Sequence, residues 1–188
     1  MELKIRLIRH GLTASNEAHK YLGLMEETLS RRGREMLIEK ARKAKRAETD
    51  LLFVSPMGRC KETAEILFPG REGICIPEWT EIDFGDFEGK NFEELKDVAT
   101  YQAWLASGGR LPFPGGESRE TFIARSMQGY ERMLAYVRSY SEDDHKLSVT
   151  AVVNGGTIMA VCSSLFGGDY FDYQIGCGGE YLCPSVTI

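Results

Sequence analysis

The sequence has no long apolar run and no excess of positive charge. Its hydrophobic segments all fall short of the roughly 18–20 residues that span a bilayer. Its start, MELKIRLIRHG, alternates charged and apolar side chains where a signal peptide would have an apolar centre. The formal net charge is -5, from 23 Lys and Arg against 28 Asp and Glu. We therefore expect a cytoplasmic protein that binds neither a membrane nor a nucleic acid.

The cysteines are not arranged as metal ligands or as redox pairs. There are 5 of them, and none belongs to a CxxC motif. This spacing favours reduced thiols over a zinc site or a catalytic dithiol. No other cluster of metal-ligand residues stands out along the sequence. We predict that the protein uses neither a metal nor another cofactor.

The composition is typical of a soluble folded protein. With 188 residues, of which 43% are hydrophobic and 27% charged, residues 1–188 suit a single domain. Apolar strand-like segments alternate with helix-like segments, which predicts a three-layer α/β/α fold with helices on both faces of a mostly parallel sheet. Met36 and Leu37 are predicted on the inner side of their helix. The predicted strands are 3–8, 51–54, 74–77 and 147–153, and the predicted helices are 31–46, 58–68, 157–165 and a long helix from residue 118.

One stretch departs from this alternation. Residues 80–116 are rich in glycine, proline and aromatic side chains, which predicts a cap-like insertion at about 83–117 over one end of the sheet. Two interpretations of its aromatic side chains stay open: a pocket for an apolar or ring-bearing alcohol, or packing in a core. The side chains concerned are Phe92, Tyr101, Trp104 and Phe113. The tail, residues 171–188, is predicted to add a hairpin or an edge strand.

Three turns from a strand into a helix carry unusual residues. They begin with Arg9-His10-Gly11, with Ser55-Pro56 and with Asn154-Gly155-Gly156. Parallel strands bring such turns to the same edge of the sheet. Arg9, His10 and Arg59 would then meet near helix N-termini, where guanidinium and backbone N–H groups bind a tetrahedral dianion well. Each turn alone is weak evidence, and the combination predicts a phosphate site.

The motifs together resemble the histidine phosphatase superfamily, which includes the cofactor-dependent phosphoglycerate mutases and the alpha-ribazole phosphatases. The resemblance runs from about residue 3 to residue 165 and implies a phosphoglycerate mutase-like fold. The shared patterns are Arg-His-Gly-x-Thr-x-x-Asn at 9–16, Ser-Pro-x-x-Arg-x-x-x-Thr-Ala at 55–64, an acidic segment at 81–89, and Pro-Gly-Gly-Glu-Ser at 114–118.

The resemblance also implies a role for each matching residue. His10 would be the nucleophile that attacks phosphorus and forms a phosphohistidine, which water then hydrolyses. Arg9 and Arg59 would bind the phosphoryl oxygens, and Asn16 would add a neutral hydrogen bond. Glu81 would donate the proton to the leaving oxygen.

Three other carboxylates lie close to Glu81 in the sequence. Asp83, Asp86 and Glu88 are rival candidates for the proton donor. Glu81 is preferred because it stands where the family pattern places the acid, four residues before Gly85. The other three then read as parts of a solvated acidic loop.

The third turn departs from the family pattern, which has His-Gly-Gly where this chain has Asn154-Gly155-Gly156. Asn154 and Gly155 are predicted to bind the phosphate, although an amide carries no positive charge and exchanges no proton. Three explanations stay open: an active natural variant, a phospho-ligand binder with vestigial activity, or a substitution introduced to trap a complex. Asn154 could also serve simply as a helix cap.

These observations predict a phosphomonoesterase that hydrolyses a small phosphorylated metabolite through His10. The alternatives are a cofactor-dependent phosphoglycerate mutase and a pseudoenzyme that binds phosphorylated ligands with little turnover. Mutases of this superfamily are usually longer, with extra segments that keep water from the phosphohistidine, so a short chain favours hydrolysis. The sequence does not decide between a monomer and a homodimer.

Overall fold

A six-stranded mixed sheet forms the centre of the computed structural model, which describes residues 2–43, 49–140 and 146–187. The strand order is β3-β2-β4-β1-β5, and β6 also pairs with β1. Strands β1, β2, β3 and β4 are parallel, whereas β5 and β6 run antiparallel to β1. The strands are β1 (Glu2–Arg9), β2 (Leu51–Val54), β3 (Ile74–Cys75), β4 (Lys146–Val153), β5 (Glu180–Leu182) and β6 (Val186–Thr187).

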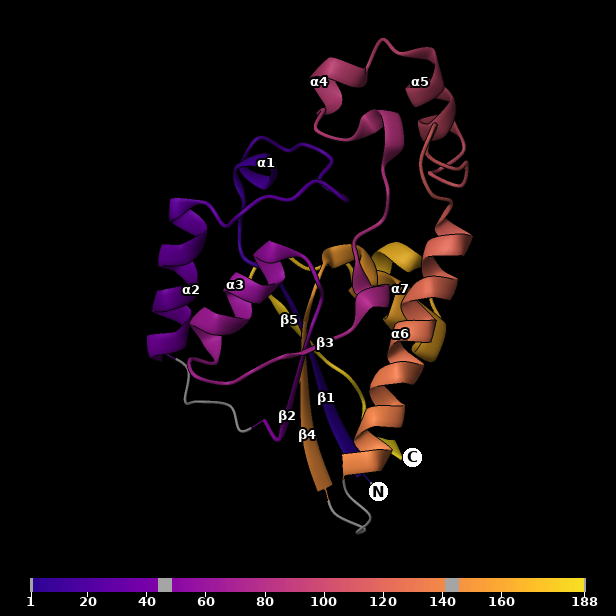
Figure 1. Ribbon diagram of the computed structural model, residues 1–188. Helices are drawn as coiled ribbons and strands as arrows, with labels where there is room; N and C mark the ends of the chain where they lie inside the picture. Colours follow the sequence, from indigo (N-terminus) through magenta and orange to yellow (C-terminus); the bar gives the residue numbers. More distant parts are fainter. Residues whose placement is uncertain (1, 44–48, 141–145, 188) are drawn as a thin grey trace.

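Helices cover both faces of this sheet (Figure 1). Helices α2 and α3 lie on one side, and α6 and α7 lie on the other, which confirms the predicted α/β/α layers. The α-helices are α1 (Ala14–Glu17), α2 (Arg31–Lys43), α3 (Gly58–Leu67), α4 (Phe92–Leu95), α5 (Ala99–Ala106), α6 (Arg119–Tyr140) and α7 (Gly155–Phe166). The 3-10 helices are η1 (Pro77–Trp79), η2 (Gly85–Phe87) and η3 (Tyr170–Tyr173).

The two faces are set by the alternation of side chains along each strand. Leu51 and Phe53 point into the larger apolar cluster, which also contains side chains of α6 and α7. Leu52 and Val54 point into a second cluster with Cys60 of α3. Strand β2 is therefore buried on both faces, as its continuous apolar sequence predicts.

Several predicted boundaries shift in the structure. The described part of helix α2 ends at Lys43, and the rest of the predicted 31–46 helix lies outside the described residues. Leu37 is buried as predicted, but the prediction for Met36 is wrong, because this side chain is 48% exposed. Helix α7 begins at Gly155, two residues before the predicted start. The tail supplies two short strands, both antiparallel to β1.

The segment 83–117 rises above the end of the sheet at which β1, β2 and β4 finish, and it carries α4 and α5 (Figure 1). An apolar cluster joins this segment to the helices beneath it. Phe87, Tyr101 and Phe113 pack there with Phe122 of α6 and Ala160 of α7. The segment is thus anchored to α6 and α7 by a small shared apolar core.

Candidate active site

The three strand-to-helix turns lie side by side at one edge of the sheet. Arg9 ends β1 and is in register with Val153, which ends the neighbouring β4. The backbone N–H of His10 donates to the Val153 carbonyl at 3.0 Å, and that of Ser55 donates to the Val152 carbonyl at 3.0 Å. The parallel ladder therefore brings together residues that are far apart in the sequence.

His10 is nearly inaccessible, with 3% of its surface exposed. Its Nδ1 lies 2.7 Å from the Gly11 carbonyl oxygen. The N–H that this contact requires is therefore on Nδ1, and Nε2 keeps its lone pair. Burial, assisted by the charges of Arg59 and Arg9, lowers the pKa of His10 to about 3, against a smaller opposing effect of the Gly11 hydrogen bond. The imidazole is neutral at pH 7, which is the form that a nucleophile needs.

Arg59 is fully buried and held from three sides. Its Nε donates to Asn154 Oδ1 at 3.1 Å, its Nη1 to the Met25 carbonyl at 3.0 Å and its Nη2 to the Gly23 carbonyl at 2.8 Å. A guanidinium has five N–H groups. Two of them therefore stay available for the oxygens of an anion.

Arg9 reaches the same edge from β1. Its Nη1 donates to the Ile175 carbonyl at 2.7 Å. Its Nε is buried and has no hydrogen-bond partner among the described residues. A Cβ at position 155 would lie 3.0 Å from this Nε, so Gly155 is what lets the N-terminus of α7 approach the guanidinium. Arginine and helix N-terminus together provide a strong local positive potential.

Asn154 lies in the interior of the site, with no solvent exposure. Its Nδ2 donates to Ser55 Oγ at 3.1 Å and to the Trp79 carbonyl at 3.1 Å. Both amide hydrogens are therefore used, and a direct hydrogen bond from Asn154 to phosphate would require one of these bonds to break. Asn154 occupies the N-cap position of α7, where its carbonyl accepts from the Ile158 N–H at 3.3 Å, but its side chain makes no capping hydrogen bond to the helix.

Asn16 lies in the short helix α1, which Thr13 caps. Its Oδ1 accepts from the Thr13 N–H at 3.3 Å and from Cys177 Sγ at 3.4 Å. Since the oxygen is engaged on this side, the Nδ2 group is the part of Asn16 that can donate to an anion.

Glu81 is 6% exposed and lies beside the N-terminus of α7. Its Oε1 accepts from the Ile82 N–H at 2.9 Å and its Oε2 from the Gly156 N–H at 3.2 Å. Burial raises the pKa of this carboxyl, although the two N–H groups and the charges of Arg59 and Arg9 oppose the shift. A raised pKa suits a carboxylic acid that gives up a proton.

The three rival carboxylates make other contacts or face the solvent. Glu88 Oε1 accepts from the N–H groups of Gly23 at 2.7 Å and Met25 at 2.9 Å, and so shapes the loop whose carbonyls hold Arg59. Asp83 Oδ1 accepts from the Gly85 N–H at 2.8 Å within its own turn. Asp86 is exposed. Neither Asp83, Asp86 nor Glu88 lines the cavity that Glu81 borders.

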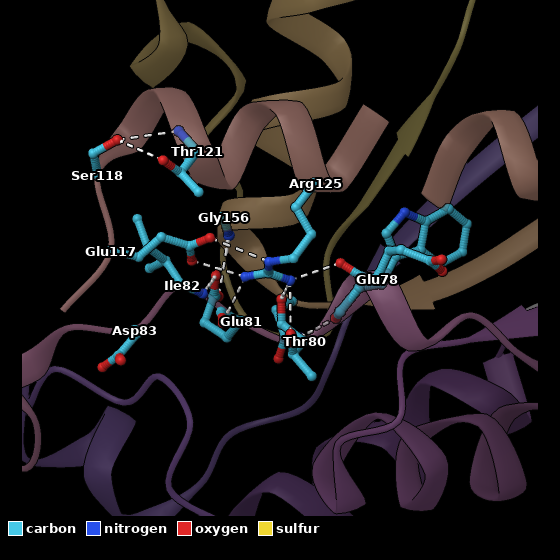
Figure 2. Close-up of polar contacts among 12 residues, drawn as sticks. Glu78, Thr80, Glu81, Ile82, Asp83, Glu117, Ser118, Thr121, Arg125 and Gly156 are labelled. Atoms are coloured by element: carbon cyan, nitrogen blue, oxygen red, sulfur yellow. Dashed lines mark hydrogen bonds and ion pairs between the residues drawn. The ribbon is translucent and has the colours of Figure 1, made fainter. Parts of the chain in front are cut away.

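Arg125, on α6, binds the backbone that leads to Glu81, and the sequence did not reveal this contact. Figure 2 shows its guanidinium between Glu117 and the segment that leads to Glu81. Its Nη1 donates to the Glu78 carbonyl at 2.7 Å and to the carbonyl and hydroxyl of Thr80 at 3.0 and 2.7 Å. Its Nη2 and Nε bind Glu117 at 2.8 and 3.2 Å. The available signal was Glu117 in the 114–118 motif, which lies just before α6 and eight residues before Arg125.

A cavity of about 300 Å³ is present at this edge of the sheet. Arg9, Asn16, Glu81 and Gly155 line one part of it. His10 does not border this cavity in the described arrangement. The cavity is therefore large enough for a small phosphorylated molecule, and bulk water has little access to the nucleophile.

In the part of the chain that the structure describes, no three histidine, cysteine or carboxylate side chains lie close enough to hold one metal ion. No helix there is both long and apolar enough to cross a membrane. All five cysteines are free.

Comparison with known proteins gives consistent results. The family model described as histidine phosphatase superfamily (branch 1) matches residues 5–175. The adenosylcobalamin/alpha-ribazole phosphatase of Escherichia coli K12 is 28% identical, over 88% of this chain and 80% of the relative. The metal-independent phosphoserine phosphatase of Arabidopsis thaliana is also 28% identical, over 98% of this chain and 75% of the relative. The crystal structure of the alpha-ribazole phosphatase from Shigella flexneri has a TM-score of 0.76 and 26% identity, over 96% and 88% of the two chains.

Proposed function

Because the chain belongs to the histidine phosphatase superfamily, we propose that it is a metal-independent phosphomonoesterase that hydrolyses a small phosphorylated metabolite through a phosphohistidine on His10. The observation that carries the proposal is the buried His10 imidazole, whose pKa is lowered by burial and by the charges of Arg59 and Arg9. Relatives that act as phosphatases support the reaction class.

In the first step, His10 Nε2 attacks phosphorus, and the bond between phosphorus and the leaving oxygen breaks. Glu81 donates its proton to that oxygen, so that the product leaves as a neutral alcohol. Arg9, Arg59 and the N-terminus of α7 offset the negative charge on the phosphoryl oxygens. In the second step, a water molecule attacks the phosphohistidine while the Glu81 carboxylate accepts its proton, which releases phosphate and restores His10.

A mutase reaction is the second candidate, and one observation favours it. His10 is 3% exposed, and shielding from water prolongs the life of a phosphohistidine. A mutase returns the phosphoryl group to another hydroxyl instead of to water. Phosphate release therefore separates the two candidates, and formation of 2-phosphoglycerate from 3-phosphoglycerate would favour the mutase.

The test is acid-quench trapping of labelled phosphate on the protein, together with steady-state phosphate release from an aryl phosphate. We expect wild-type protein to form the phosphoenzyme and to release phosphate, and His10→Ala to do neither. His19→Asn is the matched control, since His19 is exposed and its φ of 53° suits asparagine. EDTA is expected to leave the rate unchanged. Equal turnover by wild type and His10→Ala would contradict the proposal. A phosphoenzyme that neither releases phosphate nor converts 3-phosphoglycerate would indicate a pseudoenzyme.

A further inference from the structure

Six aromatic side chains line the cavity beside Glu81. These come from three separate regions of the chain: the N-terminal loop, the segment 83–117, and η3. The residues are Tyr21, Phe84, Trp104, Phe113, Tyr170 and Phe171. The sequence left open whether the aromatic residues of 83–117 form a pocket or a core, and the structure shows both. Trp104 and Phe113 line the cavity, whereas Tyr101 is 3% exposed in the core and Phe92 is 53% exposed outside the cavity.

One side of this aromatic wall is braced by contacts between its own rings. The Phe84 and Phe113 centroids lie 4.9 Å apart with the planes at 85°. Trp104 lies 5.1 Å from Phe113, and Tyr21 lies 5.1 Å from Phe84. Such edge and tilted pairs fix the rings against one another. The apolar surface is thus formed before any ligand arrives, which lowers the entropic cost of binding.

The aromatic residues of η3 are in contact with Arg119. Its guanidinium lies 5.1 Å from the centroid of Tyr170 and 5.0 Å from that of Phe171. The same group donates to the carbonyls of Gly108 and Gly109, which belong to the loop after α5. Arg119 therefore links that loop to η3 and stabilises the aromatic residues of η3.

The charges that line the cavity disfavour a ligand with an ammonium group. Among the residues that line it, Glu81 is the sole carboxylate, whereas Arg9, Lys20 and Arg119 are cationic. An ammonium group on the substrate would therefore meet three positive charges, and its one possible counterion is the proposed proton donor. An amino-acid phosphate such as phosphoserine could pair its carboxylate with Lys20 or Arg119, but its ammonium group would find no carboxylate other than Glu81.

We infer that the substrate is a phosphomonoester whose alcohol carries a planar ring and no ammonium group, with the ring seated between Trp104 and the aromatic residues of η3. This inference rests on the proposed function, because it concerns the leaving-group end of the same site. A rigid aromatic slot recognises a flat ring by stacking and by area buried, whereas a flexible alkyl chain gains less from it.

The experiment uses phosphonates, which bind without being hydrolysed, and wild-type protein in isothermal calorimetry. The probes are 3-phenylpropylphosphonate, pentylphosphonate and 2-amino-4-phosphonobutanoate, which replace the ester oxygen by carbon in a ring-bearing, an alkyl and a phosphoserine-like ligand. We expect the ring-bearing probe to bind about tenfold more tightly than the alkyl probe. The amino-acid probe is expected to bind no more tightly than the alkyl one.

Two variants locate the preference. Trp104→Leu is expected to reduce the ratio of the two dissociation constants to about threefold or less. Phe92→Leu, an exposed aromatic of the same segment outside the cavity, is the matched control and should keep the wild-type ratio. If Trp104→Leu does not fold, Phe171→Leu replaces it, since Phe171 is 46% exposed and lines the cavity.

The outcomes of the two tests can be told apart. Equal affinity for the ring and alkyl probes, or tightest binding of the amino-acid probe, overturns the inference while leaving the phosphatase proposal intact. If wild-type protein forms no phosphohistidine, the phosphatase proposal is contradicted. The ratio of the dissociation constants of the alkyl and ring-bearing phosphonates still decides the ring preference. Failure of every phosphonate to bind contradicts both.

Discussion

Asn154 Oδ1 accepts a hydrogen bond from Arg59 Nε at 3.1 Å, and neither side chain has measurable solvent exposure. Asn154→Leu removes this acceptor, whereas the bond from Ser55 Oγ to the Trp79 carbonyl at 2.7 Å does not depend on it. A buried N–H without a partner costs about 1–3 kcal/mol. We expect kcat/KM for a phosphomonoester to fall about tenfold or more, because Arg59 loses its fixed orientation.

The matched control for this loss is Thr157→Val. Thr157 is a buried neighbour on α7 whose hydroxyl has no partner among the described residues. Thr157→Val should leave kcat/KM within about twofold of the wild-type value. Similar losses in both variants would mean that Asn154 acts on packing and not on Arg59.

Asn154→His is expected to act in the opposite direction. A neutral imidazole at this position would accept the Arg59 Nε–H at one ring nitrogen and donate to a phosphoryl oxygen from the other. That second bond is charge-assisted, and Asn154 does not make it because both of its amide hydrogens are used. We expect kcat/KM to rise about tenfold or more, measured on one phosphomonoester from pH 5 to 8. An unchanged rate with an unchanged pH dependence would contradict this prediction.

Arg125→Gln is expected to destabilise the protein and to weaken catalysis together. It leaves the Glu117 carboxylate, whose side chain is 13% exposed, without its cation, and it frees the carbonyls that lead to Glu81. Removing one partner of a largely buried pair costs about 3 kcal/mol or more. Thermal melting and kcat/KM measure the two effects.

Arg132→Gln is a matched control for Arg125→Gln. Arg132 also pairs with the segment before Glu81, through the Glu78 carboxylate at 2.6 Å, but its side chain is 59% exposed. An exposed pair contributes little to stability. If both variants lower the melting temperature equally, the position of Arg125 between Glu117 and the Glu81 segment is not what matters.

Glu81→Gln should slow substrates with poor leaving groups far more than those with good ones. An alkoxide needs a proton as the bond breaks, whereas a nitrophenolate does not. The raised pKa of Glu81 also gives wild-type activity an alkaline limb, because the acid form is lost as pH rises through that pKa. The variant should lack this limb. Equal losses on alkyl and aryl phosphates would show that Glu81 is structural.

His10 should make the folded protein sensitive to acid. Its pKa is lowered to about 3 in the folded state from an ordinary value of 6.5. Between these two pH values, His10 is therefore protonated in the unfolded chain and neutral in the folded one. The free energy of unfolding then falls by up to about 1.4 kcal/mol per pH unit, or about 2 kcal/mol from pH 7 to 5. Urea unfolding measures it. The slope should be smaller in His10→Gln, and an equal slope in both proteins would contradict the assignment.

The sheet was predictable because its apolar segments have the period and the length of buried strands, and parallel pairing follows from the helices between them. The meeting of the three turns at one edge of the sheet followed from the same pairing. The exposed Met36 was not predictable, since the spacing of α2 does not say how wide a stripe the sheet covers. The roles of Asn154 and Arg125 were also hidden, because each depends on backbone carbonyls whose directions only the folded chain defines.

Strand β1 has consequences for how the chain folds. It precedes the other strands of the sheet in the sequence, yet its partners β4, β5 and β6 all come after residue 145. Until these partners are synthesised, the apolar side chains of β1 have no neighbouring strand, and His10 at its end lacks the residues that surround it in the fold. Long-range pairing of this kind slows folding, and until it is complete an unpaired strand edge that favours aggregation stays exposed. The nascent chain is therefore a natural client for chaperones, and a product cut short before β4 would carry His10 without activity.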